Sequence, residues 1–438
     1  MTSASPVPPA SSLPVPTGLA LAPFRGLRYA VADSARLARL TSPPYDVVDE
    51  EERRSLEDAD PLNVVRLILP RDADSEPGSG YRRAAETLRS WREDGVLRPD
   101  PVPGLYGYEM EAAGTRTRGL LGALALVQPG ANIVLPHEDT MAGPVADRLA
   151  LTAATEANLE AIYLVYDGGG PTTELVADFG ARRAELETTT PDGVTHRLWT
   201  LTDRSALATI AADLLGRRAV IADGHHRYAT YLRHQADRHA QQAGRGPWDR
   251  GLVLLVDASA YGPQVRAIHR VVPGLALDEA VGRAEQAFRG RDLDGGVEAA
   301  VAALAEAGKR GPAFLLTDGR RWRLIGDPDP AELAAAVPPE RSEAWRTLDV
   351  TVAHRLLIGR LWRLRDHEDV VDYRHDVPSA LAAALASGGT ALLLNPTPVQ
   401  AVVAVAATGD RMPRKSTLFT PKPRTGLVMR AYQDEPDY

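Results

Sequence analysis

The residues with the clearest capacity for chemistry are Asp223, Gly224, His225, His226 and Arg227, which stand in one unbroken string. A β-rich run leads directly into the string and a helical pattern follows, so the string is predicted to open a helix. Asp223 is placed to cap the first-turn N–H groups, and Gly224 leaves room for a ligand at the backbone. Three basic groups are unfavourable at the positive end of a helix dipole, but they favour a bound anion such as phosphate. The alternative is a capped surface helix with solvated or packed histidines.

A second polar segment contains His137, Glu138 and Asp139 and is followed by Asp147 and Arg148. It comes after a predicted strand and before a predicted helix. A histidine and a glutamate beside an aspartate can supply a general base or oxygen ligands for a magnesium ion. Adjacent side chains of an extended strand point to opposite faces, so His137 and Glu138 would not share a site if the chain is extended there. A polar loop with a helix cap is the alternative interpretation.

The segment from Arg411 to Arg424 holds five basic residues and no acidic residue, in a chain whose formal net charge is −8. Lys415 and Lys422, which lie in it, are two of only three lysines in the whole chain. Lysine presents a compact point charge suited to phosphate, whereas arginine presents a planar fork. The segment is therefore a candidate phosphate contact, and a solvated basic loop is the alternative.

Four further residues carry weaker signals. Tyr45 and Asp46 follow two prolines, which restrict that segment to an extended conformation. Asn63 precedes a predicted buried strand, and Arg66 lies within it. A charged residue in an apolar strand needs a partner. For each of these residues a structural role is the favoured interpretation.

Composition narrows the class of protein. The 438 residues correspond to two or three domains at about 100–200 residues each. The acidic balance argues against broad nucleic-acid binding, which needs a basic surface. The absence of cysteine excludes disulfides, thiolate chemistry and cysteine-ligated metals. The sequence contains no apolar run of about 18 residues and no signal-peptide pattern, so we expect a cytoplasmic protein without a membrane span.

Strand and helix patterns alternate irregularly along the chain, which predicts the α+β class. The predicted strands cover residues 64–69, 105–111, 118–127, 161–166, 219–222, 252–256, 313–316, 322–325 and 391–394, with a last one near 427–430, and the predicted helices cover 81–94, 144–159, 205–215, 224–241, 277–288, 297–307, 350–362 and 399–406. A Gly- and Pro-containing break at 243–248 predicts a domain boundary. We therefore expect a disordered tail over 1–20, a core domain over 21–245 and a C-terminal α/β region over 246–438 that returns a basic loop to the site.

Taken together, these motifs resemble those of a bacterial and archaeal family catalogued as domain of unknown function 1015. The resemblance covers nearly the whole chain after the tail. It runs in order through Pro43 to Asp46, Asn63 to Leu67, His137-Glu138 with Asp147-Arg148, Ala222 to Tyr228, Leu348 to Val350, and Met412 to Gly426. The name of that family assigns no function.

The string at residues 223–227 is also similar to the Gly-x-x-Arg phosphate-binding turn of the ParB/sulfiredoxin-like fold. In that superfamily the turn opens a helix and holds nucleotide phosphates, and its free-serine kinases carry the same Asp-Gly-His-His-Arg string. Sulfiredoxin chemistry needs a cysteine and is excluded. The resemblance implies an α+β, ParB/sulfiredoxin-like mixed-sheet core with an additional α/β C-terminal region.

The function implied is that of a phosphotransferase that moves a phosphoryl group from a nucleotide, ATP or ADP with Mg²⁺, to a small hydroxyl compound, free serine being the best candidate. Positioning, charge neutralisation and a base for the hydroxyl are what this transfer requires. The expected roles are catalytic for Glu138 (the base), Asp223 and His226, phosphate- or nucleotide-binding for Gly224, His225, Arg227, Lys415 and Ser416, and substrate-binding for Tyr45, Asp46, Asn63, Arg66 and His137.

Two alternatives stay open. One is a metal-dependent phosphoesterase with His137, Glu138, His225 and His226 near a metal ion, and the other is a nucleotide sensor without turnover. Under the phosphotransferase hypothesis, Glu138 must converge with the helix start at residues 223–227 on one cleft. The segment 411–424 must then fold back over the same cleft.

Overall fold

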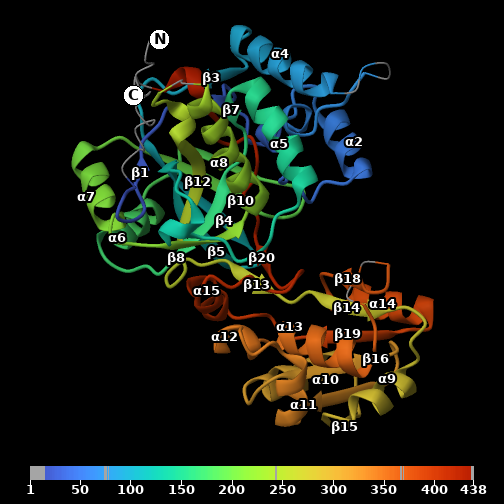
Figure 1. Cartoon of the computed structure of the whole chain (residues 1–438). Coiled ribbons are helices and arrows are strands. Elements are labelled where there is room, and N and C mark those ends of the chain that lie inside the picture. Colours follow the sequence, from blue (N-terminus) through green and yellow to red (C-terminus); the bar gives the residue numbers. More distant parts are fainter. Residues whose placement is uncertain are drawn as a thin grey trace, which may run out of the picture. The chain divides into compact units, whose positions relative to one another are not determined.

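The computed structural model describes residues 15–73, 76, 78–241, 244–365, 367 and 369–435. Positions 1–14 of the predicted tail lie outside the described residues. Leu19 is buried, and its N–H donates to the carbonyls of Leu214 and Arg217 at 3.0 and 3.2 Å. The chain forms two compact units (Figure 1). The first comprises the described residues within Met1–Pro136, Thr140–Pro263 and Pro421–Tyr438, and the second comprises His137–Asp139 and Gln264–Thr420. The predicted boundary at 245/246 precedes β12, Arg250–Asp257, which is a strand of the first unit.

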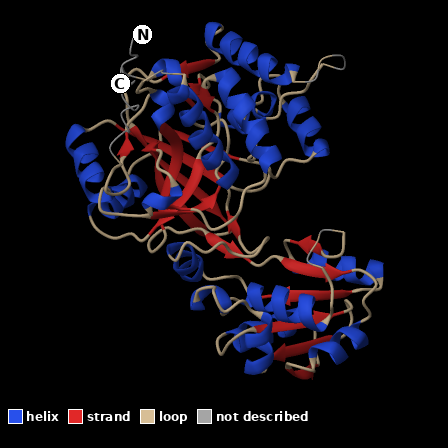
Figure 2. Cartoon of the chain, in the orientation of Figure 1, coloured by secondary structure: helices blue, strands red, loops and turns tan. Residues whose placement is uncertain are grey.

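The first unit is built on a mixed sheet (Figure 2). Its described strands run in the order β6-β11-β8-β12-β5-β4-β10-β9, and β1 also pairs with β5. β11 is parallel to β6, and β8 is parallel to β12, while the remaining neighbours are antiparallel. The bounds are β1 Leu21–Ala22, β4 Leu105–Ala112, β5 Thr115–Ala125, β6 Val134–Leu135, β8 Ile162–Tyr166, β9 Leu186–Thr189, β10 Thr195–Leu201, β11 Ala219–Asp223 and β12 Arg250–Asp257. Two short ladders join β2 Leu27–Tyr29 to β3 Leu97–Pro99, and β7 Ala157–Asn158 to β21 Arg430–Ala431.

Helices pack beside this sheet. α5 packs on both α4 and α8. The helices of the unit are α1 Ser34–Leu40, α2 Glu50–Ala59, α3 Val65–Ile68, α4 Ser79–Glu93, α5 Ala142–Thr155, α6 Pro171–Asp178, α7 Arg204–Leu214 and α8 His225–Ala240, with short turns η1 Pro129–Ala131, η2 Phe179–Ala181, η3 Pro247–Asp249 and η5 Tyr432–Asp434. The sheet's central strands are apolar on both faces, and Leu252, Val253 and Leu254 are fully buried. Ile221 of β11 and Tyr228 of α8 both belong to the buried core, which positions the turn between them.

The second unit contains an antiparallel sheet of described strands in the order β15-β17-β16-β19-β14-β18, and β13 pairs with β20 apart from it. The strand bounds are β13 Gln264–Arg266, β14 His269–Val272, β15 Arg289–Leu293, β16 Ala313–Thr317, β17 Trp322–Gly326, β18 Asp372–Arg374, β19 Thr390–Leu394 and β20 Leu418–Thr420. Its helices are α9 Leu277–Ala284, α10 Val297–Gly308, α11 Pro330–Ala336, α12 Glu343–Arg346, α13 Asp349–Val352, α14 Val377–Ser387 and α15 Val399–Ala407, and a π-helix, η4 Ala353–Leu361, continues α13. Among the described residues, no helix has the length and apolar character needed to cross a bilayer.

The predicted α+β class is confirmed, but the strand predicted over 64–69 is wrong. Those residues form the short helix α3. The side-chain oxygen of Asn63 accepts the N–H of Val65 at 2.8 Å, which turns the chain at the point where an extended run would begin. Arg66 is not a buried strand charge, because its Nη2 donates to the carbonyl of Glu57 at 2.8 Å.

Candidate functional site

The turn between β11 and α8 holds the Asp-Gly-His-His-Arg string. Gly224 is the N-cap of α8 and has φ +94°, a left-handed conformation that glycine adopts without steric cost. A Cβ on Gly224 would lie 3.1 Å from the Nε of Arg227. The prediction that Asp223 caps the helix is wrong, because the cap residue is Gly224 and no side chain caps this helix start. The helix start therefore offers its first-turn N–H groups without a capping carboxylate.

Asp223 instead forms a buried ion cluster. Its Oδ2 accepts from the Nη2 of Arg227 at 2.5 Å, and its Oδ1 accepts from the Nζ of Lys422. Burial raises the pKa of Asp223, but the charges of Lys422 and Arg227 outweigh burial and hold this pKa below its usual value. Asp223 is therefore an anion at neutral pH, fixed between two cations.

Arg227 is 5% exposed, and its guanidinium has several contacts besides Asp223. Its Nη1 donates to the carbonyl of Ala161 at 2.5 Å, and the guanidinium carbon lies 6.0 Å from the ring centroid of Tyr45. Burial lowers the pKa of Arg227, but nearby anions, Glu160 foremost, raise it above its usual value overall. With both Nη atoms engaged, Arg227 fixes the conformation of the turn.

The Tyr45 segment is attached to this cluster through Glu160, which is 5% exposed. The Oε1 of Glu160 accepts the N–H of Tyr45 at 3.0 Å and the hydroxyl of Thr425 at 3.3 Å. Burial raises the pKa of Glu160, although the charge of Arg227 opposes this. The carboxylate of Asp46 lies 4.0 Å from the Nζ of Lys422. Tyr45 and Asp46 are thus placed at the edge of the turn.

Of the segment 411–424, Lys422 reaches the turn, where its Nζ donates to Asp223. Two residues later, Arg424 fixes the segment: its Nε and Nη2 donate to the hydroxyl and carbonyl of Thr41 at 3.1 and 3.0 Å. The N–H of Arg424 donates to the hydroxyl of Tyr108 at 3.0 Å, and that hydroxyl lies 2.9 Å from the Nδ1 of His196. Lys422 is therefore held at Asp223 by the backbone on its C-terminal side.

The two histidines of the string are differently placed. His225 is buried, with 6% of its surface exposed. The Nε2 of His226 accepts the N–H of Met141 at 3.1 Å. Burial lowers the pKa of His226, with Asp46 opposing, so the imidazole is neutral at pH 7. A neutral imidazole that accepts at Nε2 carries its proton on Nδ1, which leaves His226 as a hydrogen-bond donor.

Asn63 is fully buried and acts on the backbone. Its Nδ2 donates to the carbonyls of Arg39 and Thr41 at 2.6 and 3.1 Å. Thr41 also accepts hydrogen bonds from the guanidinium of Arg424. Asn63 therefore supports the region that fixes the C-terminal segment. Arg66 likewise donates to the carbonyl of Glu57. These hydrogen bonds give Asn63 and Arg66 each a structural role.

The remaining predicted site residues belong to the second unit. His137 is fully buried, and its Nε2 lies 3.0 Å from the hydroxyl of Thr417 and 3.8 Å from the Oε1 of Glu138. The Thr417 hydroxyl is also 3.5 Å from that oxygen of Glu138. The carbonyl of His137 accepts the N–H of Met412 at 2.8 Å. Residues 137–138 and 412–417, which are far apart in sequence, therefore form one group.

Lys415 and Ser416 lie in the same group. Lys415 has φ +53°, and its carbonyl accepts from the Nη2 of Arg270 at 2.8 Å. The Ser416 hydroxyl donates to the carbonyl of Pro413, and the Ser416 carbonyl accepts the hydroxyl of Thr397 at 3.3 Å. These hydrogen bonds therefore fix the conformation of the loop at 413–417. The convergence of Glu138, Lys415 and Ser416 with the turn stays a prediction.

No group of three or more His, Asp or Glu side chains within the described ranges is arranged to hold a metal ion. Mg²⁺ is typically held by one or two carboxylates together with substrate phosphates and water. The described side chains therefore do not fit a site in which the protein alone holds the metal.

Sequence reasoning missed Glu160 and the contacts of Arg424. A signal for Glu160 was present, because a lone carboxylate at the start of the apolar run Ala161–Tyr166 must find a partner when it is buried. Nothing local indicates that Arg424 reaches Thr41 or that its N–H meets Tyr108. These contacts join positions 383 and 316 residues apart.

A profile of the family described as "Protein of unknown function (DUF1015)" matches residues 21–351. No curated protein matches the chain in sequence.

Several solved structures resemble the chain with low TM-scores. A conserved hypothetical protein from Pyrococcus furiosus has 13% identity and a TM-score of 0.33, over 69% of this chain and 94% of that chain. A free serine kinase in complex with AMP has 14% identity and a TM-score of 0.33, over 66% and 83%. SbnI from Staphylococcus aureus, truncated at its C-terminus, has 8% identity and a TM-score of 0.34, over 70% and 86%. At these identities and TM-scores, the matches assign no function to the chain.

Proposed function

The chain belongs to the DUF1015 family, whose description assigns no activity, and we propose from its own residues that it is a phosphotransferase. It would move a phosphoryl group from a nucleoside phosphate, ATP or ADP, to the hydroxyl of a small molecule, with free serine as the best candidate. The observation that carries the proposal is the β11–α8 turn, where Gly224 leaves the start of α8 without a side-chain cap and Lys422 stands beside it.

The proposed donor site uses three kinds of group. First-turn N–H groups of α8 and the positive end of the helix dipole would bind phosphate oxygens. Lys422 would supply the point charge, and the Nδ1 proton of His226 a further donor. Arg227 would act indirectly, by holding Asp223 and the backbone of Gly224. Asp223 balances the charge of Lys422 and keeps it at the turn when no phosphate is bound.

The proposed transfer is a direct displacement. The acceptor oxygen forms a bond to the terminal phosphorus, the bond from phosphorus to the bridging oxygen breaks, and the nucleotide leaves with one phosphate fewer. Glu138 would take the hydroxyl proton, with His137 beside it, and Lys415 and Ser416 would close over the phosphates. Tyr45 and Asp46 at the edge of the turn would contact the acceptor. These roles follow from the resemblance of the string and from the charge of each segment.

The metal-dependent phosphoesterase is less favoured, because the described residues provide no grouped set of metal ligands. A nucleotide sensor uses the same phosphate turn and differs only in turnover. The deciding experiment incubates the protein with ATP or ADP, Mg²⁺ and L-serine, and measures both nucleotide consumption and phosphoserine. Nucleotide binding without consumption, across a panel of small hydroxyl compounds, would establish the sensor instead.

Lys422→Met tests the donor site, and Lys309→Met is the matched control. Lys309 is an exposed lysine paired with Glu306 in the second unit. Loss of a charge-assisted contact worth about 1.5–3 kcal/mol should weaken nucleotide binding roughly 10- to 100-fold in the first variant only. Equal affinities in both variants, measured by calorimetry on folded protein, would remove Lys422 from the site.

A further inference from the structure

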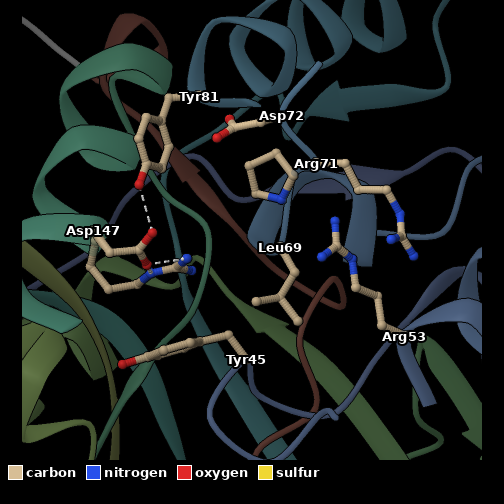
Figure 3. A pocket seen from close by; sticks show the side chains of 9 residues that line it. Tyr45, Arg53, Leu69, Arg71, Asp72, Tyr81 and Asp147 are labelled. Atoms are coloured by element: carbon tan, nitrogen blue, oxygen red, sulfur yellow. Dashed lines mark hydrogen bonds and ion pairs between the residues drawn. The ribbon is translucent and has the colours of Figure 1, made fainter. Parts of the chain in front are cut away.

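A cavity of about 540 Å³ lies in the first unit (Figure 3). Side chains from α2, α4 and α5 line it, together with Tyr45 and the connection that follows α3. We call it the Tyr45 cavity. Cavities of about 300–1,000 Å³ are typical of small-molecule sites. The occupant must be inferred from where the cavity lies and from the chemistry of its lining.

The segment at Tyr45 connects the cavity to the β11–α8 turn. Tyr45 lines the cavity, and the carboxylate of the next residue, Asp46, lies 4.0 Å from the Nζ of Lys422. The ring centroid of Tyr45 is 4.3 Å from the guanidinium carbon of Arg148, which also lines the cavity. The same centroid is 6.0 Å from the guanidinium carbon of Arg227, which belongs to the turn. Tyr45 therefore contacts residues of both places.

Helix α5 makes a second connection between the cavity and the turn. Its N-cap, Met141, donates its N–H to the Nε2 of His226 at 3.1 Å, and Asp147, six residues further along, lines the cavity. Six residues of α-helix span about 9 Å. The cavity and the turn are therefore neighbours in the first unit, and a small molecule in the cavity can extend one group to the turn.

The charged groups that line the cavity already have partners. Each of the three lining arginines has a carboxylate within 3.6 Å, and the lining carboxylate of Asp72 accepts the N–H groups of Gly78 and Gly80 at 2.9 and 2.8 Å. A ligand with a net charge would add a charge that this lining does not balance, which is costly in a partly buried site. The lining therefore favours a neutral ligand. The ion pairs are Arg53 and Arg71 with Glu50 and Glu57, and Arg148 with Asp147.

The paired groups retain hydrogen-bonding capacity. Asp147 and Arg71, with 41% and 39% of their side chains exposed, stand on opposite sides of the cavity in Figure 3. The Oδ1 of Asp147 accepts the hydroxyl of Tyr81 at 2.7 Å and keeps a second lone pair. Each Nη of Arg71 donates one N–H to a glutamate at 2.8 Å and keeps another. A hydroxyl group donates to a carboxylate and accepts from a guanidinium, so hydroxyls can bind both groups without adding charge.

We propose that the Tyr45 cavity binds the acceptor of the phosphoryl group, and that this acceptor is a neutral polyol such as a cyclitol or a monosaccharide. The proposal rests on the proposed phosphotransferase function. Hydroxyl groups of the polyol would bind Asp147 and Arg71, and a further hydroxyl would reach the turn beside Lys422. The transfer is the displacement described above, with a polyol oxygen as the attacking atom.

Free serine, the candidate that the string at residues 223–227 suggests, fits the cavity less well. Its single hydroxyl is used by the transfer, and its two remaining polar groups are charged. The nucleoside of the donor is the other possible occupant. Five of the nine lining residues are charged, whereas small-molecule pockets that take flat apolar groups are lined mainly by hydrophobic and aromatic side chains. The lining therefore favours a polyol over both.

A comparison of acceptors tests the class of substrate. The full chain is incubated with ATP or ADP, Mg²⁺ and one acceptor, either myo-inositol, D-glucose, D-sorbitol or L-serine, and the phosphorylated product is measured by mass spectrometry. We expect kcat/KM for at least one polyol to exceed that for L-serine by about tenfold or more, since hydrogen bonds to charged groups carry factors of this size. Equal or faster phosphorylation of L-serine would overturn the polyol assignment and leave the phosphotransferase function standing. Nucleotide binding without a phosphorylated product from any acceptor would overturn both.

Variants then locate the polyol. Asp147→Asn keeps the size of the side chain but offers one acceptor oxygen in place of two, so KM for the polyol should rise roughly 10-fold or more while nucleotide affinity is unchanged. Glu156→Gln is the control, because Glu156 follows the C-terminal end of α5 and 59% of its side chain is exposed. Arg71→Lys keeps the charge without the fork and should raise the same KM by a smaller factor, which keeps the test valid if Asp147→Asn fails to fold.

Two results with these variants would overturn the proposal. Weaker nucleotide binding in Asp147→Asn, with an unchanged KM for the polyol, would place the nucleoside of the donor in the cavity. A KM for the polyol that is the same in Asp147→Asn, Arg71→Lys and Glu156→Gln would place the acceptor elsewhere.

Discussion

Burial changes the effect that Arg227, a cation at the start of α8, has on the stability of the protein. An exposed cation in the first turn opposes the helix dipole by about 0.3–1 kcal/mol, so its removal should be harmless. Here the cation is instead the buried partner of Asp223 and a donor to Ala161. Removing Arg227 would leave Asp223 with one cationic partner fewer, Lys422 remaining, and would take a donor from the carbonyl of Ala161, and burial makes such losses costly. The buried contacts of Arg227 therefore contribute more to stability than its unfavourable interaction with the helix dipole takes away.

We accordingly expect Arg227→Ala to lower the free energy of unfolding by about 3–5 kcal/mol, measured by urea denaturation without ligand. Arg233→Ala is the control, because Arg233 lies on the same helix and also pairs with an aspartate four residues away, Asp237, but is 66% exposed. That exposed pair should contribute no more than about 1 kcal/mol. Similar small losses in both variants would show that Arg227 is not a structural cation.

Asp349 gives a pH-dependent prediction. Burial raises its pKa from 3.8 to about 7, although a hydrogen bond with Asn395 opposes the shift. The folded state therefore holds a proton that the unfolded state releases between pH 4 and 7. A raised pKa means that this contribution to stability is present below pH 4 and is lost as pH rises through 7.

Asp349→Asn should remove that loss. The variant should be more stable than the parent protein at pH 8, by up to about 4 kcal/mol, and similar to it at pH 4. Urea denaturation at pH 4, 6 and 8 measures the difference, and Asp294→Asn at an exposed position of the same unit controls for the change in net charge. A difference that does not depend on pH would contradict the assignment.

At the scale of elements, local signals determined what the sequence could predict. The hairpin of β4 and β5 was predictable, because the turn at Ala113 and Gly114 is local, and both residues adopt positive φ. The strand expected at 64–69 failed because the side chain of Asn63 sets the backbone of Val65. Apolar runs of this length do not distinguish a buried strand from a buried helix.

For the candidate site, too, the sequence could predict local features but not contacts between distant residues. The Asp223 string and its position at a helix start were readable locally. The pairing of Asp223 with Lys422 spans 199 residues, and only the scarcity of lysine pointed to it. Arg227 and Glu160 acquire their roles from burial, which the sequence does not display.

The segment that carries Lys422 gives a prediction of its own. The hydroxyl of Tyr108 accepts the N–H of Arg424, so Tyr108→Phe removes that acceptor and should destabilise the protein by about 1 kcal/mol. Amide exchange should accelerate at 422–425, and nucleotide affinity should fall with it. Exchange that accelerates in β4 but not at 422–425 would show that Tyr108 serves the sheet alone.

At the scale of the whole molecule, the chain leaves its first unit after Pro263 and returns to it at Pro421. The returning segment is part of that unit's interior. Arg430 is fully buried, and it donates to the side-chain oxygen of Asn158 and to the carbonyls of Arg250 and Pro247 at 2.9–3.0 Å. The first unit therefore cannot complete its fold until the second unit has been synthesised.

Deletion of residues 421–438 should thus weaken one unit selectively. Without Arg430, the side-chain oxygen of Asn158 and the carbonyls of Pro247 and Arg250 lose a donor, and β7 loses its partner β21. Unpaired buried polar groups cost about 1–3 kcal/mol each. Hydrogen exchange measured by mass spectrometry should show reduced protection in β12 of the first unit and unchanged protection in β16 of the second. Arg430→Met should shift β12 in the same direction by a smaller amount, since it keeps the β7–β21 ladder. Equal losses in β12 and β16 would instead mean that the two units unfold as one cooperative body.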